Sequence, residues 1–288
     1  MTKIDLGVLF NTDRLSGPAF IDHAKRVEAT GMGSMWLAEL FGREPFAAAS
    51  AVLAATSKLR VGTAIANIYA RDAVAAAAAS ATLAEMSGDR FELGLGVSNR
   101  GLNERRGHQW TAPAPRMANY LAEIRRTELA IGDHSYPIHI AAHGPKMLAV
   151  AAEGADGVFT YLMNPEHTAT TRRSLAPGTT LSPMMMCLLC PDPVEARRLA
   201  RKAIGYYTGL DYYHRAWRTL GFDDDDFANG GSDRLIDSVV AWGPIETIRA
   251  RISAHGDAGA TRLVVIPLNP AGGGQPDWSL LEQLGAQS

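Results

Sequence analysis

Short apolar segments of strand length alternate with helical patterns along almost the whole chain. The strand-length segments are 4–10, 34–39, 59–66, 91–97, 137–142, 157–162, 181–189 and 263–268. Apolar runs such as 264–268 are typical of parallel strands that are covered on both faces. Eight strands alternating with helices predict an α/β fold of the (β/α)8 TIM-barrel class.

The helical patterns between these strands begin at recognisable residues. Asp72 is expected to cap an alanine-rich helix that runs to Met86, and Pro145 to begin another helix at its first position. The helix that begins at Pro145 is expected to cover 145–154, and the other patterns cover 17–30, 45–57, 115–131 and 244–255.

The stretch between the seventh and eighth predicted strands is too long for one helix. It contains helical patterns at 193–209, 211–220 and 232–241 and an acidic run at 223–226. We therefore predict a helical insertion over 190–242 within a single barrel domain that covers 1–288. The acidic run is expected to be a solvated loop rather than a metal site.

Composition and charge narrow the classes of function. The chain has 288 residues, and a barrel needs about 250. Lysine and arginine number 28 against 30 acidic residues, so there is no electrostatic argument for binding nucleic acid or an anionic membrane. No segment reaches the roughly 18 apolar residues of a membrane span, and the N-terminus does not resemble a signal peptide. We expect a cytoplasmic protein that acts on a small molecule.

Three patterns that suggest other chemistries are weak. Gly94-Leu-Gly96 follows a strand, but Asn99 stands where a dinucleotide-binding motif requires a third glycine, so these glycines are expected to end a barrel strand. Cys187 and Cys190 are expected to be inert strand residues. The eight histidines lack metal-ligand spacing, so we expect no catalytic metal.

The junction between the fifth strand and the next helix is a candidate anion site, because ligands of TIM barrels bind at the C-terminal ends of the strands. Backbone N–H groups of Gly144, Lys146 and Met147 are expected to be free at this helix N-terminus, and Lys146 adds a positive charge. An ordinary strand–turn–helix junction is the alternative interpretation.

The third predicted strand has small residues where bulky ones normally fill a barrel. Thr63, Ala64 and Ala66 would leave room for a flat ligand, and Asn67 at the rim would supply a donor. Together with the anion site, this arrangement suits an aromatic cofactor with a phosphate tail. Close helix packing is the alternative explanation of the small residues.

Four segments together resemble the bacterial luciferase-like monooxygenase superfamily, and most closely its coenzyme F420-dependent oxidoreductase branch. They are WLAELFGREPF (36–46), VGTAIANIYARDA (61–73), LAEMSGDRFELGLGVS (83–98) and PIHIAAHGPKMLAVAAEGADGVF (137–159), with VAWGPIETIRARI (240–252) as a companion near the end. The resemblance implies that F420, or alternatively FMN, binds with its ring in the barrel mouth. The ring would lie against a bulge with a non-proline cis peptide bond, here Ala64–Ile65.

The resemblance also implies roles for individual residues. The residues expected to contact the cofactor are Thr63, Ala64, Ile65 and Asn67 at the ring or linker, His143, Gly144, Pro145, Lys146 and Met147 at the phosphate, and Tyr161 after the sixth strand. Candidates for proton transfer are, in order of preference, Glu39, Glu104 and His108. Leu40 stands where some relatives have a histidine base, so their proton-transfer scheme does not carry over.

These expectations lead to an F420-dependent oxidoreductase that transfers a hydride between the deazaflavin C5 and a small organic substrate. An FMNH2-dependent monooxygenase on the same barrel and a non-catalytic F420- or flavin-binding protein are the alternatives. The resemblance further implies a homodimer through 45–57 and 72–86. The small side chains of the second segment permit close helix approach, although burial inside the monomer would explain them equally well.

Overall fold

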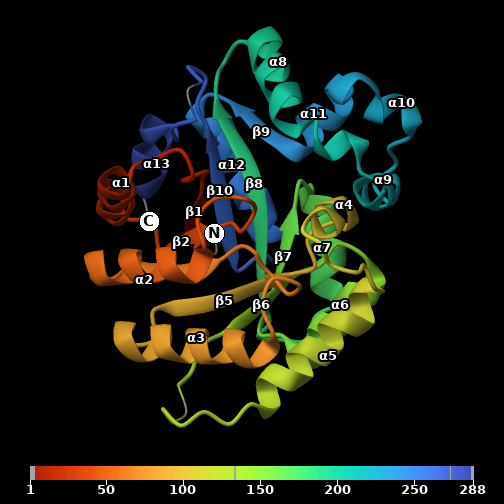
Figure 1. The fold of residues 1–288 in the computed structure, drawn as a ribbon. Coiled ribbons are helices and arrows are strands. Elements are labelled where there is room, and N and C mark those ends of the chain that lie inside the picture. The colour runs from red at the N-terminus through yellow and green to blue at the C-terminus, as the bar shows by residue number, and fades with distance from the viewer. Residues whose placement is uncertain (1–3, 133, 273, 287–288) are drawn as a thin grey trace. The chain divides into compact units, whose positions relative to one another are not determined.

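The computed structural model describes residues 4–132, 134–272 and 274–286. Its strands are parallel in every pairing given below and alternate with helices (Figure 1). The strand order is β10-β1-β2-β3-β5-β6-β7-β8-β9, with further pairings of β10 with β8 and of β4 with β5. This cyclic order of parallel strands is that of a (β/α)8 TIM barrel, so the predicted fold class is confirmed.

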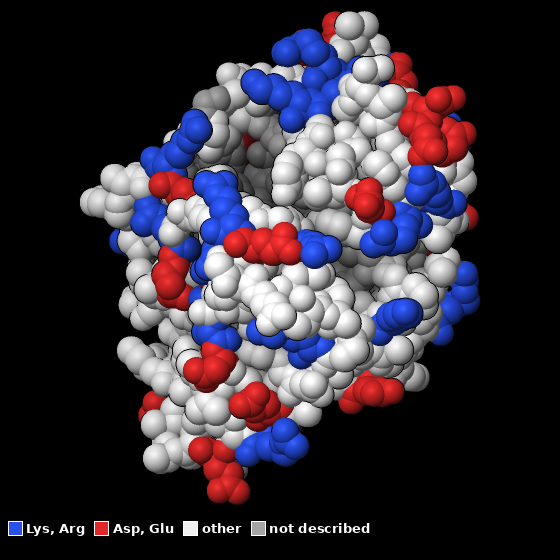
Figure 2. Space-filling view, turned by 45° about the vertical axis from the view of Figure 1, so that its right-hand side comes forward, with Lys and Arg blue, Asp and Glu red and all other residues white. Residues whose placement is uncertain are grey.

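The chain divides into two compact units, which are described separately. The N-terminal unit consists of Asn11–Phe159 with Ser174–Thr180, and the C-terminal unit consists of Met1–Phe10, Thr160–Arg173 and Leu181–Ser288. Acidic and basic side chains are interspersed among uncharged ones on the face shown in Figure 2, in keeping with the near balance of charge in the sequence.

The sheet of the N-terminal unit contains six parallel segments. They are β2 (Ser34–Leu37), β3 (Arg60–Thr63), β4 (Ala66–Asn67), β5 (Phe91–Gly96), β6 (Ile138–Ala141) and β7 (Gly157–Tyr161), which ends just inside the other unit. The helices are α1 (Gly17–Ala29), α2 (Pro45–Ala55), α3 (Ala73–Ser87), α4 (Arg100–Arg105), α5 (Pro113–Arg126) and α6 (Pro145–Gly154).

Local sequence sets the ends of α3. The side chain of Asp72 accepts a hydrogen bond from the backbone N–H of Ala75 at 2.7 Å, which confirms the predicted cap. Gly88 ends the helix in the left-handed conformation, with φ of 65°, which glycine adopts without steric cost. The alanine-rich helix packs beside α2, and the two run next to each other in orange in Figure 1.

Bulky side chains fill the interior of this unit on the N-terminal side of the small residues of β3. The Trp36 ring packs edge-on against Phe159, with centroids 4.8 Å apart, and lies over Gly62, where an added Cβ would come within 2.4 Å of it. His139 also contacts both rings and hydrogen-bonds Glu92 at 2.8 Å. The small residues therefore begin where this packed layer ends.

The C-terminal unit has a sheet of four parallel strands. They are β1 (Asp5–Leu9), β8 (Thr180–Leu189), β9 (Val240–Gly243) and β10 (Arg262–Leu268), paired in the order β1-β10-β8-β9. The helices are α7 (Pro165–Arg173), α8 (Pro193–Ile204), η1 (Tyr207–Gly209), α9 (Asp211–Arg218), α10 (Asp224–Phe227), η2 (Ala228–Gly230), α11 (Asp233–Val239), α12 (Ile245–Asp257) and α13 (Trp278–Gly285).

Two predictions about the inserted region are wrong. The helix expected over 232–241 ends at Val239, and β9 follows at once, because the apolar residues at its end pair with β8 instead of continuing the helix. The acidic run is not a loop and is only partly solvated: Asp223, Asp224 and Asp225 are exposed, but Asp223 caps the short helix α10 and Asp226 is buried against Ser232 and Arg234. Neighbouring donors, rather than water, satisfy that carboxylate.

Other differences concern element boundaries. The helices α4 and α7 were not predicted, and α5 begins at Pro113 and ends at Arg126 instead of spanning 115–131. Cys187 lies in β8 and Cys190 just beyond it; both are buried and free, and burial raises the pKa of the Cys187 thiol. The interpretation of Cys187 as an unreactive strand residue is thereby supported. In the part of the chain that is described, no helix is long and apolar enough to cross a membrane.

Candidate functional site

The third predicted strand is interrupted by a bulge that contains a cis peptide bond. This bond joins Ala64 and Ile65, as the resemblance implied, and that prediction is confirmed. Before the bulge Gly62 pairs with Glu92, and after it Ala66 pairs with Leu95. The chain thus advances four positions while β5 advances three, so one extra residue is accommodated between β3 and β4.

Thr63 bridges the gap that the bulge leaves in the sheet. Its hydroxyl donates to the backbone oxygen of Gly94 at 2.6 Å and accepts from the backbone N–H of Gly94 at 2.9 Å. These two bonds replace a rung of the backbone ladder, and the side chain is fully buried. Thr63 was predicted as a cofactor contact, but its only hydroxyl proton is already used within the sheet.

Gly94 and Gly96 make room for the bulge. A Cβ added at Gly94 would lie 1.8 Å from the backbone oxygen of Thr63, and one at Gly96 would lie 1.6 Å from Cδ1 of Ile65. A side chain at Gly94 would require the backbone of the bulge to shift, and one at Gly96 would require the Ile65 side chain to move. The prediction that these glycines end a barrel strand is confirmed, since β5 ends at Gly96.

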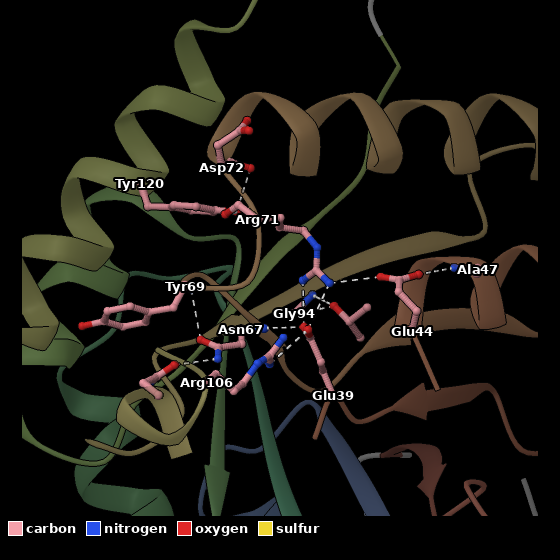
Figure 3. Close-up of polar contacts among 12 residues, drawn as sticks. Glu39, Glu44, Ala47, Asn67, Tyr69, Arg71, Asp72, Gly94, Arg106 and Tyr120 are labelled. Atoms are coloured by element: carbon pink, nitrogen blue, oxygen red, sulfur yellow. Dashed lines mark hydrogen bonds and ion pairs between the residues drawn. The ribbon is translucent and has the colours of Figure 1, made fainter. Parts of the chain in front are cut away.

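Glu39 lies two residues after β2 and holds the chain just beyond the bulge (Figure 3). Its carboxylate accepts the backbone N–H of Asn67 at 2.8 Å and two hydrogen bonds from Arg71, at 2.7 and 3.1 Å. Arg106 approaches the same carboxylate at 3.6 Å. Only 7% of the Glu39 side chain is exposed, and both of its oxygens have protein partners. This geometry suits a residue that positions its neighbours.

Asn67 is anchored through its side chain as well as its backbone. The Nδ2 group donates to Oδ1 of Asn103 at 2.8 Å, and Oδ1 accepts the backbone N–H of Tyr69 at 3.1 Å. Asn103 in turn donates to the backbone oxygens of Val97 and Asn99. One of the two amide N–H bonds of Asn67 remains available to a ligand. The expected donor is therefore present and held in one orientation.

A shallow, solvent-open hollow lies beside this network. It combines polar groups with an apolar rim, since Leu40 and Phe41 are 52% and 55% exposed. The guanidinium of Arg105 lies 4.6 Å from the centre of the Phe41 ring. The lining residues are Glu39, Leu40, Phe41, Asn67, Ser98, Leu102 and Arg106. The lining thus offers both polar and apolar contacts to part of a ligand.

The other two candidates for proton transfer lie apart from the Glu39 network. Glu104 on α4 pairs with Arg100 at 2.7 Å, and about half of its side chain is exposed. The His108 ring lies 6.0 Å from that of Tyr69, which stacks on Trp110. Neither residue lines the hollow. The structure thus brings Glu39 and Asn67 together, and leaves Glu104 on a solvated helix face.

The candidate phosphate site is an open helix N-terminus. Gly144 precedes Pro145 at the start of α6 without a side-chain cap, and an added Cβ at Gly144 would meet no described heavy atom within 4 Å. Pro145 and Lys146 are exposed, and His143 lies on the same turn. The N–H of Met147 is bonded to the Gly144 oxygen at 3.1 Å, so the expectation that it is free is wrong. The predicted junction is otherwise present and accessible, and it fits an anion.

Tyr161 ends β7 and belongs to the C-terminal unit. Its hydroxyl donates to the hydroxyl of Tyr207 at 3.3 Å, and burial raises the pKa of the Tyr161 phenol. Its predicted contact with a cofactor stays a prediction. In the described part of the chain, no group of three or more histidine, cysteine or acidic side chains has the arrangement of a metal site.

Several residues of the site carry no signal in the sequence. Arg71 and Arg106 follow Glu39 by 32 and 67 positions in the chain, and although Arg71 lies in the segment 61–73, no local pattern identifies either arginine as a partner of Glu39. Leu40 and Phe41 directly follow Glu39 at the end of a predicted strand, and this position was the one indication in the sequence that they belong to the site. The exposure of two large apolar side chains becomes evident only in the folded chain.

Comparison with known proteins agrees with this architecture. The family model described as luciferase-like monooxygenase matches residues 11–262. A 5,10-methylenetetrahydromethanopterin reductase from Methanolobus tindarius is 24% identical, and the match covers 86% of this chain and 90% of the reductase.

Two solved structures show the same fold. An F420-dependent secondary alcohol dehydrogenase in complex with an F420–acetone adduct has a TM-score of 0.77 at 16% identity, and the match covers 99% of this chain and 98% of the dehydrogenase. The FMN complex of the oxygenating constituent of 3,6-diketocamphane monooxygenase, a type II Baeyer–Villiger monooxygenase from Pseudomonas putida, has a TM-score of 0.68 at 15% identity. That match covers 98% of this chain and 97% of the monooxygenase.

Proposed function

Because this chain belongs to the luciferase-like monooxygenase family, we propose that it is an F420-dependent oxidoreductase acting on a small organic substrate. The observation that carries the proposal is the occurrence in one unit of the two features that a ring-and-phosphate cofactor needs. These are the bulge at Ala64–Ile65 and the open N-terminus of α6. The similarity to an F420-dependent dehydrogenase supports F420 as the cofactor.

When bound, F420 supplies hydride chemistry at its C5 atom, and the protein supplies binding and orientation. The free N–H groups at the start of α6, together with Lys146, would hold the phosphate. The small residues Ala64 and Ala66 would leave space for the flat ring, with the remaining N–H of Asn67 at its edge. His143, Gly144, Pro145, Met147 and Ile65 complete the proposed contact set within the N-terminal unit.

Glu39 would act mainly as a positioning residue. Its carboxylate holds the backbone of Asn67 and the guanidinium of Arg71, so both oxygens are engaged as acceptors. A general acid must give up a proton in reach of the substrate, and a doubly engaged carboxylate is poorly placed for that. Proton transfer by Glu104 or His108 would require them to approach the ligand from outside the hollow.

An FMNH2-dependent monooxygenase is the second candidate. FMN also combines a flat ring with a phosphate, and an FMN complex is among the proteins that share this fold. The two cofactors can be separated by titrating the purified protein with each and then supplying the reduced forms. We expect F420 to bind more tightly and its reduced form to be oxidised by an organic acceptor without consumption of oxygen.

The opposite results would change the assignment in defined ways. Tighter binding of FMN with consumption of oxygen would identify the monooxygenase. Tight binding of F420 without turnover across a panel of ketones, enones and alcohols would favour a non-catalytic binding protein. If neither cofactor binds, the proposed function is wrong.

We also propose that the chain forms a homodimer through α2 and α3. Mostly apolar side chains line a shallow hollow between these helices, including Met86, which is 72% exposed. Val74, elsewhere on α3, is 47% exposed. A second copy would cover this apolar surface. Sedimentation should give a dimer for the native chain and a monomer for Met86→Glu, whereas a native monomer would exclude the proposal.

A further inference from the structure

Five of the eight tyrosines of the chain gather in the C-terminal unit. They are Tyr161 at the end of β7 and Tyr206, Tyr207, Tyr212 and Tyr213 in the predicted insertion, and together they are called the tyrosine cluster. The ring centroids of Tyr161 and Tyr207 are 5.1 Å apart, those of Tyr207 and Tyr213 are 5.3 Å apart, and those of Tyr206 and Tyr207 are 5.4 Å apart. The rings meet edge to face, a favoured arrangement for aromatic side chains.

A hydrogen bond attaches the predicted insertion to the residue that follows β7, beside the tyrosine cluster. The indole N–H of Trp217 donates to the backbone oxygen of Leu162 at 2.9 Å, and both side chains are fully buried. Leu162 has a φ of 55°, which is rare for a large side chain. Backbone outliers of this kind concentrate at ligand sites, where the surrounding structure maintains them. The end of β7 is therefore held in an unusual conformation next to Tyr161.

The hydroxyl group of Tyr207 accepts a hydrogen bond within the cluster and keeps its own proton available. Tyr161 donates to Tyr207 at 3.3 Å, so Tyr207 acts as the acceptor of this bond. A phenol has one proton to donate in addition to its lone pairs. No acceptor for the Tyr207 proton occurs among the described residues. Burial raises the pKa of both phenols, so both remain protonated at neutral pH.

The cluster also presents apolar surface to solvent. Tyr206 is 57% exposed and Tyr212 is 37% exposed, whereas Tyr213 is buried beneath them. Ligands of TIM barrels bind at the C-terminal ends of the strands, which is where Tyr161 lies. An uncharged apolar ligand with one hydrogen-bond acceptor would match this combination of ring faces and the phenol proton of Tyr207.

We propose that the tyrosine cluster binds an uncharged apolar compound with a carbonyl oxygen, such as an aryl ketone, and that this oxygen accepts a hydrogen bond from Tyr207. Tyr206 and Tyr212 contact the apolar body, and Tyr161 is a positioning residue that acts through Tyr207. The inference rests on the proposed function in one respect, namely that such compounds are the substrate class of the oxidoreductase. Binding itself is independent of the cofactor.

The test compares two probes with cofactor-free full-length protein by calorimetric titration. 2-Acetonaphthone carries the carbonyl group, and 2-ethylnaphthalene has a similar shape without it. We expect Tyr207→Phe to weaken binding of the ketone by about three- to tenfold, as expected for the loss of one hydrogen bond, and to leave the hydrocarbon unaffected. Tyr206→Ala should weaken both probes. Tyr136→Phe, which removes a partly buried phenol hydroxyl of the other unit, is the matched control and should change neither.

Equal affinity of the native protein and Tyr207→Phe for the ketone would overturn the inference, as would failure of the native protein to bind it. A circular dichroism spectrum and unfolding midpoint close to those of the native protein confirm that the variants are folded. If Tyr207→Phe does not fold, the comparison of ketone with hydrocarbon on Tyr206→Ala still decides whether the cluster binds the probes. F420 titration of the same proteins is a separate readout: loss of F420 binding alone would contradict the proposed function and leave this inference standing.

Discussion

The carboxylate of Glu39 accepts the backbone N–H of Asn67 at 2.8 Å, which ties the end of β2 to the short strand β4. The same carboxylate holds Arg71 through two hydrogen bonds, and Arg71 also pairs with Glu44. One buried acid thus fixes the chain immediately after the bulge. Glu39 also lines the hollow, so it would affect a bound ligand both directly and through the position of Asn67.

Replacing Glu39 by glutamine should destabilise the fold, because Arg71 and Arg106 would lose their shared charge partner. We expect a loss of about 2 kcal/mol in the free energy of unfolding, measured by urea denaturation. Glu104→Gln removes an exposed acid that pairs within one helix and should leave the urea midpoint unchanged. Similar midpoints for Glu39→Gln and Glu104→Gln would show that the Glu39 network is not a structural element.

Replacing Thr63 by valine should lower the stability of the fold, because it removes the two hydrogen bonds that Thr63 makes with Gly94 beside the bulge. Valine keeps the branched shape but leaves the N–H and oxygen of Gly94 without their partner, at a cost of about 1–3 kcal/mol. Thr63→Ser keeps the hydroxyl and loses one buried methyl group, worth about 1 kcal/mol. Thermal unfolding of the two variants should therefore rank serine above valine. The reverse order would mean that packing, not hydrogen bonding, makes threonine necessary.

Much of this arrangement follows from local sequence. Asp72 and Pro145 mark helix starts because capping and proline geometry act over a few residues, and both are found where they were predicted. The strand β9 was missed because its four residues directly continue a helix, so no turn residue separates the two patterns. Periodicity cannot locate a boundary that lies inside one apolar run.

The polar contacts of the candidate site join residues that are far apart in the chain, so they could not be predicted from the sequence. Thr63 and Gly94 are 31 positions apart, and Glu39 and Arg71 are 32 apart. Nothing in either local pattern specifies the partner. The acidic run is a related case, because Asp226 is buried by a bond to Arg234, which local composition does not reveal. The exposure of the run as a whole was predictable, but the burial of this one member was not.

The buried histidine of α12 should make stability depend on pH. Burial, with Arg251 and His167 nearby, lowers the pKa of His255 to about 3 in the folded chain. The unfolded chain has a histidine pKa of about 6.5, so it binds the proton first as the pH falls. Between these two values the free energy of unfolding should decrease by up to about 1.4 kcal/mol per pH unit, whereas above the unfolded value this group contributes no dependence.

Urea unfolding at about pH 7 and about pH 5 measures this effect. The native chain should be less stable at the lower pH, and His255→Gln should remove part of that difference. His23→Gln on α1 is the control, because His23 is only partly buried, and it should behave like the native chain. An unchanged difference in His255→Gln would assign the acid sensitivity to other groups.

The central claim, that the open N-terminus of α6 holds the phosphate of F420, is tested most directly by the F420 affinity of two Gly144 variants. An added Cβ meets open space there, so Gly144→Ala should bind F420 like the native chain. Gly144→Asp should bind at least about tenfold more weakly, or about 1.4 kcal/mol, because its carboxylate would repel the phosphate. Equal affinity of the aspartate and alanine variants would contradict the claim.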